Sequence, residues 1–298
     1  MSSLLLLTLL LFPAGPDTAG LLSRIQALIK ASTAVETNAA QRAAPDVAVA
    51  LLHLDGRPAV MLQPDTSFHA ASTMKVPVMI ELFRQAEAGG LRLDDQLPVR
   101  NEFHSIVDGS VYTMDVSADS DAEVYKAAGK TMSLRDLNEA MITVSSNFAA
   151  NLLIERLGAK NVQQTVDRLG GAGVVVLRGV EDQKAFDKGM NNTTTAGGLA
   201  VLLQKLATGT AVSAKADAEM IQVLKRQKFN DAIPAGVPAG TPVAHKTGTI
   251  TRIHHDAAIV YGPKPYVLVI LVRGIQEQKE SAALMASISR EVWAEMSR

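Results

Sequence analysis

Apolar positions alternate between helical and strand-like spacing in the first part of the chain. From residue 21 to residue 34 the apolar side chains recur at helical spacing and predict an amphipathic helix. The continuous apolar run of residues 46–54, DVAVALLHL, is typical of a buried strand. Asp55-Gly56 offers a tight turn, and a second strand is expected over residues 59–62.

Helical signals fill the middle of the chain, and strand signals return near its end. From Ser72 onward the apolar positions mostly follow a helical period. Buried-strand runs resume at residue 243, and Gly262-Pro263 marks a turn between two of them. The sequence therefore predicts helices over residues 133–157, 195–206, 216–226 and 281–296, and strands over residues 243–253, 256–261 and 266–273.

Strands at both ends with helices between them predict one sheet assembled from both ends of the chain. The helical block would be inserted into this sheet, which gives an α/β lobe beside an all-α lobe. We expect a single catalytic domain over residues 21–298. Its α/β lobe would comprise about residues 21–68 and 235–298, and its helical lobe about residues 69–234. A cleft between two lobes is a common place for a ligand site.

Composition narrows the class of protein without naming a partner. The 298 residues are 47% hydrophobic and 20% charged, with a formal net charge of -1. These values exclude a disordered chain, a collagen-like chain and a strongly basic nucleic-acid-binding protein. Because the chain has no cysteine, disulfides, thiol catalysis and thiolate metal sites are also excluded.

The first twenty residues predict export. Leu4 to Phe12 form an apolar run that only Thr8 interrupts, and small residues follow it. The run is too short to cross a bilayer as a helix and fits the apolar region of a secretory signal. We therefore expect residues 1–20 to be a signal peptide of a periplasmic or extracellular protein that is not stably inserted in a membrane. The alternative is a buried N-terminal helix.

The first candidate for chemistry is the segment Ser72-Thr73-Met74-Lys75. At the start of a helix, Ser72 and Lys75 would share one face. A serine hydroxyl becomes a nucleophile when a base takes its proton, and a lysine can do so once burial or other cations lower its pKa. Pro77 would lie beyond the first turn of this helix, which is unusual for proline. The alternatives are an N-cap serine with a solvated lysine, and a helix that begins later.

The second candidate, Ser145-Ser146-Asn147, interrupts a long helical stretch. The apolar pattern stops before these residues and resumes after them, and Gly158 fits the end of the second helix. Two hydroxyls and an amide between helices can point into a cleft. Three turn-forming residues can equally make a plain turn.

The third candidate, Lys246-Thr247-Gly248-Thr249, lies inside a predicted strand. A glycine inside a strand weakens it and often marks the close approach of a ligand or another backbone. Lys246 would place a positive charge beside the cleft. The threonine hydroxyls and the Thr249 N–H could bind a carboxylate and a developing oxyanion. The alternative is an edge strand protected by a lysine and a bulge.

In this order, the three motifs resemble the signature of penicillin-binding proteins and class A β-lactamases, which is Ser-x-x-Lys, Ser-x-Asn and Lys-Thr-Gly. The resemblance runs from about Leu21 to the C-terminus and includes the segments VSSNFAANLLI and NNTTTAGGLAVLLQKL. It implies a β-lactamase/transpeptidase-like fold, with an antiparallel sheet flanked by terminal helices and an all-α lobe. It also implies a serine hydrolase that needs no metal and no other cofactor.

The resemblance assigns roles by motif position. Ser72 is similar to the acylated nucleophile of the family, and Lys75 to its proton acceptor. Ser145, helped by Lys246, would pass the proton to the departing lactam nitrogen, and Asn147 would hold the amide side chain of the substrate. Thr247 and Thr249 of the third motif would contact the substrate carboxylate, and Gly248 would let the substrate approach the strand closely. The N–H groups of Ser72 and Thr249 would bind the oxyanion.

The chain departs from the class A pattern at three places. Ser146 stands where aspartate is usual, which we expect to alter the support of the loop rather than the chemistry. Residues 107–130 lengthen the span between the first two motifs and are expected to form an extra excursion near the cleft mouth.

Class A enzymes also have a deacylating glutamate before the Asn192-Thr193-Thr194 segment, followed four residues later by asparagine. Glu181 is the best match, but position 185 is alanine, so Glu181 is either this base or a solvated loop carboxylate.

Deacylation separates the functions that remain open. Rapid attack of water on the ester would make the protein a β-lactamase, whereas a lasting ester would make it a D-alanyl-D-alanine peptidase or a β-lactam sensor. We expect a monomer that acts on a small β-lactam or a peptidoglycan stem peptide, with no nucleic-acid partner. A metal hydrolase is disfavoured, because His254 and His255 are adjacent in a strand and point to opposite faces. His255 or Arg252 could instead contact a substrate carboxylate.

Overall fold

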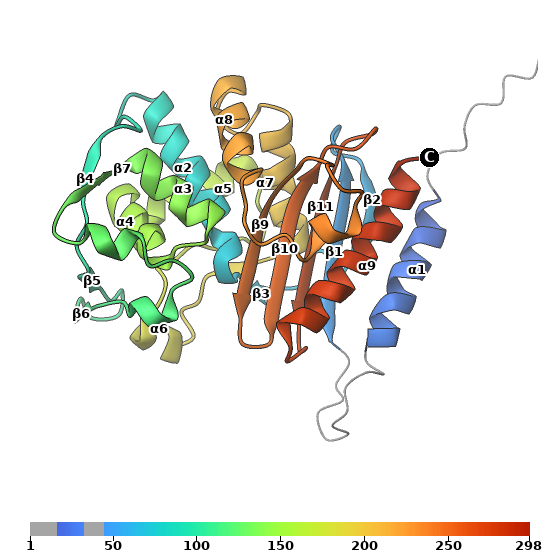
Figure 1. The fold of residues 1–298 in the computed structure, drawn as a ribbon, viewed down its shortest axis with the longest axis horizontal. Helices are drawn as coiled ribbons and strands as arrows, with labels where there is room; N and C mark the ends of the chain where they lie inside the picture. The colour runs from blue at the N-terminus through green and yellow to red at the C-terminus, as the bar shows by residue number, and fades with distance from the viewer. Residues whose placement is uncertain (1–16, 33–44) are drawn as a thin grey trace, which may run out of the picture.

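The computed structural model describes residues 17–32 and 45–298, and its centre is a five-stranded sheet. The strands run in the order β2–β1–β11–β10–β9, and every neighbouring pair is antiparallel. Strands from both ends of the chain thus share one sheet, as the sequence predicts (Figure 1). The bounds are Asp46–His53 (β1), Pro58–Leu62 (β2), Val243–Ile250 (β9), Ile253–Val260 (β10) and Tyr266–Arg273 (β11).

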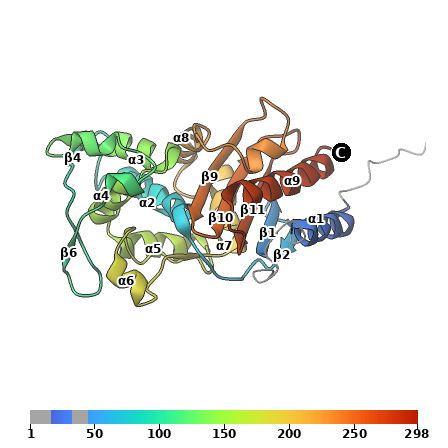
Figure 2. The same ribbon diagram turned by 60° about the horizontal axis from the view of Figure 1, so that its bottom comes forward.

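The central strand β11 shows why both faces of the sheet are covered. It pairs along its full length with β1 on one side and β10 on the other, and all its residues but Arg273 are buried. Such a continuous apolar run is typical of a strand covered on both faces. Helices α1 (Thr18–Ser32) and α9 (Gln278–Met296) pack on one face, and α7 (Ala196–Ala207) packs on the other (Figures 1 and 2).

The helical lobe is built around α2 (Lys75–Glu87). Residues 75–83 of this helix are all buried, which is typical of a helix at the centre of a core. The lobe is helical, as the sequence predicts, and the chain between α2 and α3 crosses it partly in extended form, with short strand pairs. The helices are α3 (Leu134–Thr143), α4 (Asn147–Leu157), α5 (Ala159–Leu169), α6 (Gln183–Asp187) and α8 (Ala214–Leu224), with single turns η2 (Ala71–Met74), η3 (Val116–Ala118), η4 (Val124–Ala127) and η5 (Ile233–Gly236). The short pairs are β4 (Gln96–Pro98) with β7 (Thr131–Ser133), β5 (Phe103–His104) with β6 (Val111–Tyr112), and β3 (Phe68–His69) with β8 (Thr193–Thr194).

The first helix begins earlier than the apolar pattern predicts. Helix α1 starts at Thr18 because the Asp17 side chain accepts a hydrogen bond from the Gly20 N–H at 2.9 Å and caps the helix. The last residues of the predicted signal peptide, residues 1–20, are therefore helical. Its apolar run, Leu4 to Phe12, lies outside the described residues. Within residues 17–32 and 45–298, no helix is both long and apolar enough to cross a membrane.

The hairpin between β9 and β10 also turns earlier than predicted. Thr251-Arg252 forms the turn, and Arg252 adopts a φ of 58°. Neither residue is glycine or asparagine, the usual signals for such a turn, so the strand pattern continued through it. The earlier turn pairs His254 with Thr249 and His255 with Gly248. Strand β9 is the edge of the sheet nearest the helical lobe and lies against η2, which brings the third motif to the first (Figure 1).

Candidate active site

Ser72 lies on η2, a single 3₁₀ turn that leads directly into α2. The α-helix begins at Lys75, so Pro77 falls in its first turn, where a missing N–H is tolerated. The unusual position of Pro77 is thus explained by the later helix start. Ala71 has a φ of 45°, and its N–H donates to His69 Nδ1 at 3.0 Å. This contact holds the strained residue that precedes the serine.

Gly248 on β9 lets the strand touch the backbone of η2. A Cβ atom at this position would lie 3.1 Å from the backbone nitrogens of both Ser72 and Thr73. The close approach predicted from a glycine inside a strand is therefore confirmed, because a side chain here would push η2 away. In the part of the chain that the structure describes, the Ser72 hydroxyl makes no hydrogen bond.

Lys75 is fully buried, and its ammonium group is surrounded by oxygen atoms. Its Nζ donates to the Ser145 carbonyl at 2.6 Å, to Asn147 Oδ1 at 2.7 Å and to Ser145 Oγ at 3.3 Å. Burial lowers its pKa to about 7, against the opposing negative charges of Asp119 and Glu181. A lysine with this pKa is partly neutral at pH 7 and can accept a proton.

Ser145 receives hydrogen bonds from the amines of two motifs. It lies in the bend between α3 and α4 with a φ of 59°. Lys246 Nζ donates to Ser145 Oγ at 2.9 Å and to the Thr247 carbonyl at 2.9 Å. Burial and the charge of Lys75 hold the pKa of Lys246 well below its ordinary range. The structure therefore joins all three motifs through one hydroxyl, which can relay a proton.

Asn147 connects Lys75 to Glu181. Its Oδ1 accepts from Lys75, and its Nδ2 donates to Glu181 Oε1 at 3.1 Å. Glu181 is exposed and has a φ of 63°. Partial desolvation raises its pKa above the ordinary value, while the Asn147 hydrogen bond and the Lys75 charge oppose the rise. The short loop thus brings Glu181 to the second motif.

Two buried asparagines hold the loop that carries Glu181. Asn151 Oδ1 accepts from the Val180 N–H at 2.6 Å, and Asn151 Nδ2 donates to the Val180 carbonyl at 3.0 Å. Asn192 Oδ1 accepts from the Arg178 N–H at 3.2 Å, and its Nδ2 donates to the Arg178 carbonyl at 2.9 Å. These bonds satisfy backbone groups that would otherwise be unpaired, and they fix the residues just before Glu181.

Ala185 cannot replace the asparagine that class A enzymes have four residues after their glutamate. Its side chain is buried and has no polar group. Asp182 secures this part of the loop instead. Its Oδ1 accepts from the Ala185 N–H at 3.1 Å and from Ser105 Oγ at 2.9 Å, and its Oδ2 accepts from the Ile106 N–H at 2.9 Å. The loop is therefore tied at this point to Ser105 and Ile106, just before the 107–130 excursion, rather than to the acylation site.

Asp119 supports the second motif from a segment that no sequence pattern connects with it. Its carboxylate accepts from the N–H groups of Asn147 at 2.9 Å and Phe148 at 2.8 Å, at the positive end of α4. Ser146 caps the same helix end, because its Oγ accepts from the Ala149 N–H at 3.3 Å. Part of the loop support thus comes from the 107–130 excursion. Its polar composition is the only signal that the sequence offers for this role.

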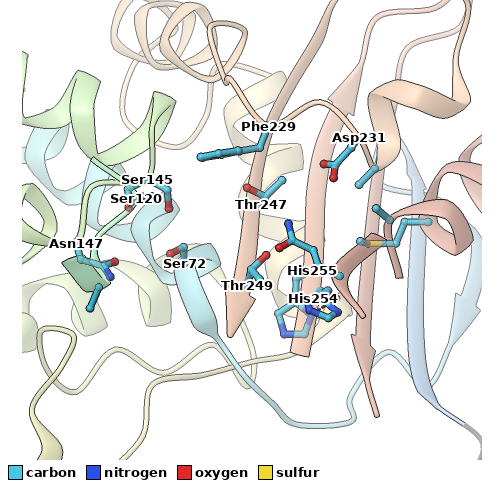
Figure 3. A pocket seen from close by; sticks show the side chains of 15 residues that line it. Ser72, Ser120, Ser145, Asn147, Phe229, Asp231, Thr247, Thr249, His254 and His255 are labelled. Atoms are coloured by element: carbon cyan, nitrogen blue, oxygen red, sulfur yellow. Dashed lines mark hydrogen bonds between the residues drawn. The ribbon is translucent and has the colours of Figure 1, made fainter. Parts of the chain in front are cut away.

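A cleft between the lobes exposes residues of all three motifs (Figure 3). Ser72, Ser145, Asn147, Thr247 and Thr249 line it, while Lys75 and Lys246 lie beneath its surface. Ser120 of the excursion contributes to the wall on the side of the helical lobe. On the other side, the cleft continues past β9 to residues of β10 and α9. The predicted site residues other than Glu181 and Gly248 are therefore at the cleft or directly below it.

The adjacent histidines point to opposite sides of β10, as strand alternation predicts. His254 Nδ1 lies 2.6 Å from Ser281 Oγ on α9, and His255 Nε2 lies 2.9 Å from the His69 carbonyl. Burial lowers the pKa of both rings, that of His255 to about 4. Arg252 is not among the residues that line the cleft. Within the described ranges, no three His, Cys, Asp or Glu side chains are placed to hold a metal ion.

Comparison with known proteins agrees with this geometry over nearly the whole chain. The family model described as the beta-lactamase enzyme family matches residues 24–296. Beta-lactamase L2 from Stenotrophomonas maltophilia is 28% identical over 281 residues, which cover 88% of each chain.

Solved structures of two kinds are similar to this one. An ancestral class A β-lactamase is 25% identical with a TM-score of 0.74, covering 91% of this chain and 98% of its own. A variant of PBP-A, an acyl-enzyme complex with penicillin G, is 26% identical with a TM-score of 0.76, covering 93% of this chain and 96% of its own. The fold is thus shared by β-lactamases and by a protein captured as an acyl-enzyme with penicillin.

Proposed function

The chain belongs to the beta-lactamase enzyme family as a serine hydrolase, and on that premise we propose that it is a β-lactamase of class A type that opens the β-lactam amide through an ester on Ser72. The Asn147 side chain carries this proposal, because it hydrogen-bonds Lys75 with one atom and Glu181 with another. One amide thereby holds a candidate base for each half of the reaction.

Acylation begins when Ser72 Oγ attacks the lactam carbonyl and neutral Lys75 takes the hydroxyl proton. The N–H groups of Ser72 and Thr249 stabilise the oxyanion, which is usually a large contribution to catalysis. When the C–N bond breaks, the proton passes from Lys75 through Ser145 Oγ to the lactam nitrogen. The hydrogen bonds from Lys75 and Lys246 to Ser145 support this route.

Deacylation needs a base that takes a proton from water, and Glu181 is the carboxylate that hydrogen-bonds the Asn147 side chain of the second motif. Glu181 takes a proton from water, the hydroxide attacks the ester carbonyl, and the ester bond to Ser72 breaks. The proton then returns to Ser72 Oγ. A carboxylate with a raised pKa is a better base than an ordinary one, provided that it is ionised at the working pH.

The buried alanine at position 185 favours a second function, a penicillin-binding peptidase or sensor with slow deacylation. Without the polar side chain that class A enzymes have there, the attacking water has one partner fewer. In this case the Ser72 ester would persist long enough to be isolated, and the similar PBP-A variant was itself captured as an acyl-enzyme complex with penicillin G.

A chromogenic cephalosporin tests the proposal when turnover and intact mass are recorded together. We expect continuous colour release and an adduct that appears only transiently. A lasting adduct without turnover would support the peptidase or sensor, and no adduct at all would reject the whole mechanism. Ser72→Ala should abolish both adduct and turnover, because it removes the nucleophile. An adduct that survives this change would mean that another residue is acylated.

We also propose that the enzyme acts outside the cytoplasm. The apolar run from Leu4 to Phe12, with small residues after it, supports export through a secretory signal. Comparing the mass of the protein recovered from the periplasm or medium with that of the full chain would test this proposal.

A further inference from the structure

An unpaired carboxylate lines the cleft on the side away from the helical lobe. Asp231 is exposed there, and its carboxylate oxygens face Thr247 across the cleft in Figure 3. Within residues 17–32 and 45–298 this carboxylate has no hydrogen bond and no ion pair. Phe229 also lines the cleft with 37% of its surface exposed, and its ring extends toward Ser145 in Figure 3. An acid and an aromatic ring therefore face the cleft together.

No cation on the cleft surface balances Asp231. Among the lining residues, Asp231 is the one with a formal charge, and none is lysine or arginine. The lining histidines, His254 and His255, have pKa values lowered by burial and are neutral at pH 7. Thr247 offers a hydroxyl but no charge. The lining of the cleft thus carries one formal charge, the negative charge of Asp231, although the substrate carboxylate is proposed to bind in the same cleft.

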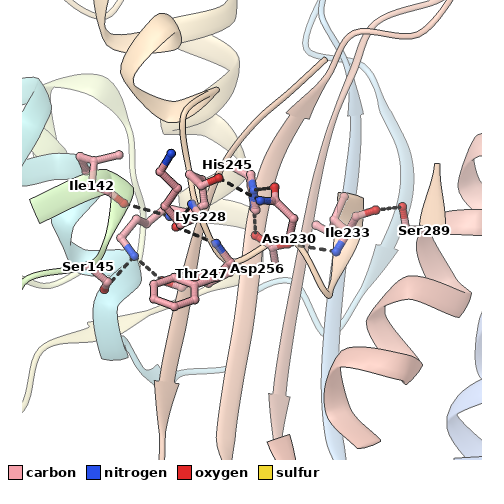
Figure 4. A network of polar contacts seen from close by, with 12 residues as sticks. Ile142, Ser145, Lys228, Asn230, Ile233, His245, Thr247, Asp256 and Ser289 are labelled. Carbon is pink, nitrogen blue, oxygen red and sulfur yellow. Dashed lines mark hydrogen bonds and ion pairs between the residues drawn. The ribbon is translucent and has the colours of Figure 1, made fainter. Parts of the chain in front are cut away.

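A polar network that is buried at His245 and Asp256 holds the segment that carries Phe229 and Asp231 (Figure 4). Asn230 Oδ1 lies 3.1 Å from His245 Nε2, and His245 Nδ1 lies 2.9 Å from Asp256 Oδ1. Asp256 Oδ2 also accepts from the Ile233 N–H at 3.0 Å. Because Asn230 and Ile233 lie on either side of Asp231 and both bond to residues of the sheet, the backbone of Asp231 is fixed at the cleft.

Gln227 fixes the other end of this segment to the helical lobe. Its Nε2 donates to the Ile142 carbonyl at 2.9 Å, and its Oε1 accepts from the Phe229 N–H at 3.2 Å. The Gln227 side chain is buried, so these bonds are shielded from water. The wall is therefore preorganised from both lobes, as a specificity site requires.

We propose that Asp231 and Phe229 form a subsite for an organic cation on the leaving-group side of a β-lactam, so that zwitterionic β-lactams are preferred. The inference rests on the proposed function, which places the substrate carboxylate at Thr247 and Thr249. A carboxylate attracts the positive charge, and an aromatic face also favours it. A substrate with only its carboxylate at this end would instead be repelled by Asp231.

Two cephalosporins with the same 7-acyl chain test this subsite. One carries a neutral 3′-acetoxy group and the other a cationic 3′-pyridinium group. The acylation rate constant of each is measured from the Ser72 adduct by mass spectrometry, so that slow deacylation does not affect the result. Asp231→Asn is expected to lower the pyridinium-to-acetoxy ratio by about fivefold, the effect of one unit charge about 4 Å away in water.

A second variant, Phe229→Leu, and a change in ionic strength make the test more specific. The leucine variant should also lower the ratio, and raising the ionic strength should lower it in the unchanged protein but not in Asp231→Asn. Asp65→Asn removes an exposed carboxylate that does not line the cleft, and it should leave the ratio unchanged. If the pyridinium-to-acetoxy ratio is the same in Asp231→Asn and in the unchanged protein, the subsite is overturned but the proposed function is not. Absence of a Ser72 adduct with both compounds would overturn the proposed function and the subsite with it.

Discussion

The acylation side of the cleft is buried, whereas the loop that carries Glu181 lies at its surface. Lys75 and Lys246 are fully buried, and each Nζ donates hydrogen bonds to Ser145 and to a further oxygen. Glu181 is exposed and has one side-chain hydrogen bond within the described ranges, from Asn147. Its backbone is held from behind, through the bonds of Asn151 to Val180.

In the proposed mechanism, this difference means that formation and release of the ester depend on different parts of the protein. Burying an amine costs several kcal/mol unless it is paired, so two buried lysines with lowered pKa values are typical of a functional site. An exposed carboxylate such as that of Glu181 has little desolvation free energy to offset, and its position depends on the loop that carries it. Changes in the core should therefore abolish acylation, while changes in the loop should mainly alter the lifetime of the ester.

The largest expected effect comes from Lys75→Arg. Arginine keeps the positive charge but cannot lose its proton in a protein, so acylation of Ser72 should slow by about 10²–10⁴-fold, the usual contribution of a general base. Stopped-flow measurement of the adduct with a chromogenic cephalosporin gives the rate. Lys205→Arg on α7, outside the cleft, is the matched control and should acylate normally.

A folding defect could imitate this loss, so Lys75→Met and thermal unfolding accompany the test. The methionine variant removes the buried charge and should unfold at a similar or higher temperature, yet it should also fail to acylate. Normal acylation by either folded variant would show that Lys75 does not accept the Ser72 proton.

Glu181→Gln should have the next largest effect, and on the other half of the reaction. Glutamine keeps the shape of the side chain and an oxygen that can accept from Asn147, but it cannot take a proton from water. We expect deacylation to slow by about 10²-fold or more, so that the adduct accumulates, while acylation stays within about threefold. Asp187→Asn on α6 is the control, because its carboxylate lies on the same loop and, among the described residues, accepts a side-chain hydrogen bond from Gln183 alone. Unchanged turnover in Glu181→Gln would leave Glu181 as a surface carboxylate.

The sequence predicts the acylation side well, because its residues lie in ordered local motifs. The positions of Ser72 and Lys75 follow from one turn of helix, and Gly248 signals the close approach of β9. The sheet from both ends of the chain follows from apolar runs such as β11. These features depend on residues that lie close together in the sequence and on which residues are buried, and both can be inferred from the pattern of residue types.

The loop side depends on contacts between distant segments, which no local pattern records. Asp119 reaches the start of α4 from the excursion, and Asn151 on α4 holds Val180 next to Glu181. Asp231 faces the cleft only because the sheet and the helical lobe fix its neighbours. Whether Glu181 reaches the site could not be decided from the alanine at position 185, because the residues that anchor the loop lie elsewhere in the chain.

The smallest expected effect is a shift in the pH dependence of acylation, and the pH dependence of the unchanged protein is needed first. In the proposed mechanism neutral Lys75 accepts the Ser72 proton, and burial lowers the pKa of Lys75 to about 7, so acylation should increase as the pH rises through 7. Below that point the neutral fraction falls, by about fivefold from pH 7 to pH 6 and by about tenfold for each further unit. The adduct rate constant, measured from pH 5 to pH 9, should show this single inflection.

Glu181→Gln should move that inflection to lower pH, by less than about one unit. The negative charge of Glu181 raises the pKa of Lys75, so removing the charge leaves burial less opposed and the neutral amine more favoured. Acylation at pH 6 should therefore be slightly faster in Glu181→Gln than in the unchanged protein, although its ester is released more slowly. Asp187→Asn should not shift the inflection. An inflection that stays in place, or moves to higher pH, would mean that the loop holds Glu181 too far from Lys75 to act on it, and the two sides of the cleft would then be electrostatically independent.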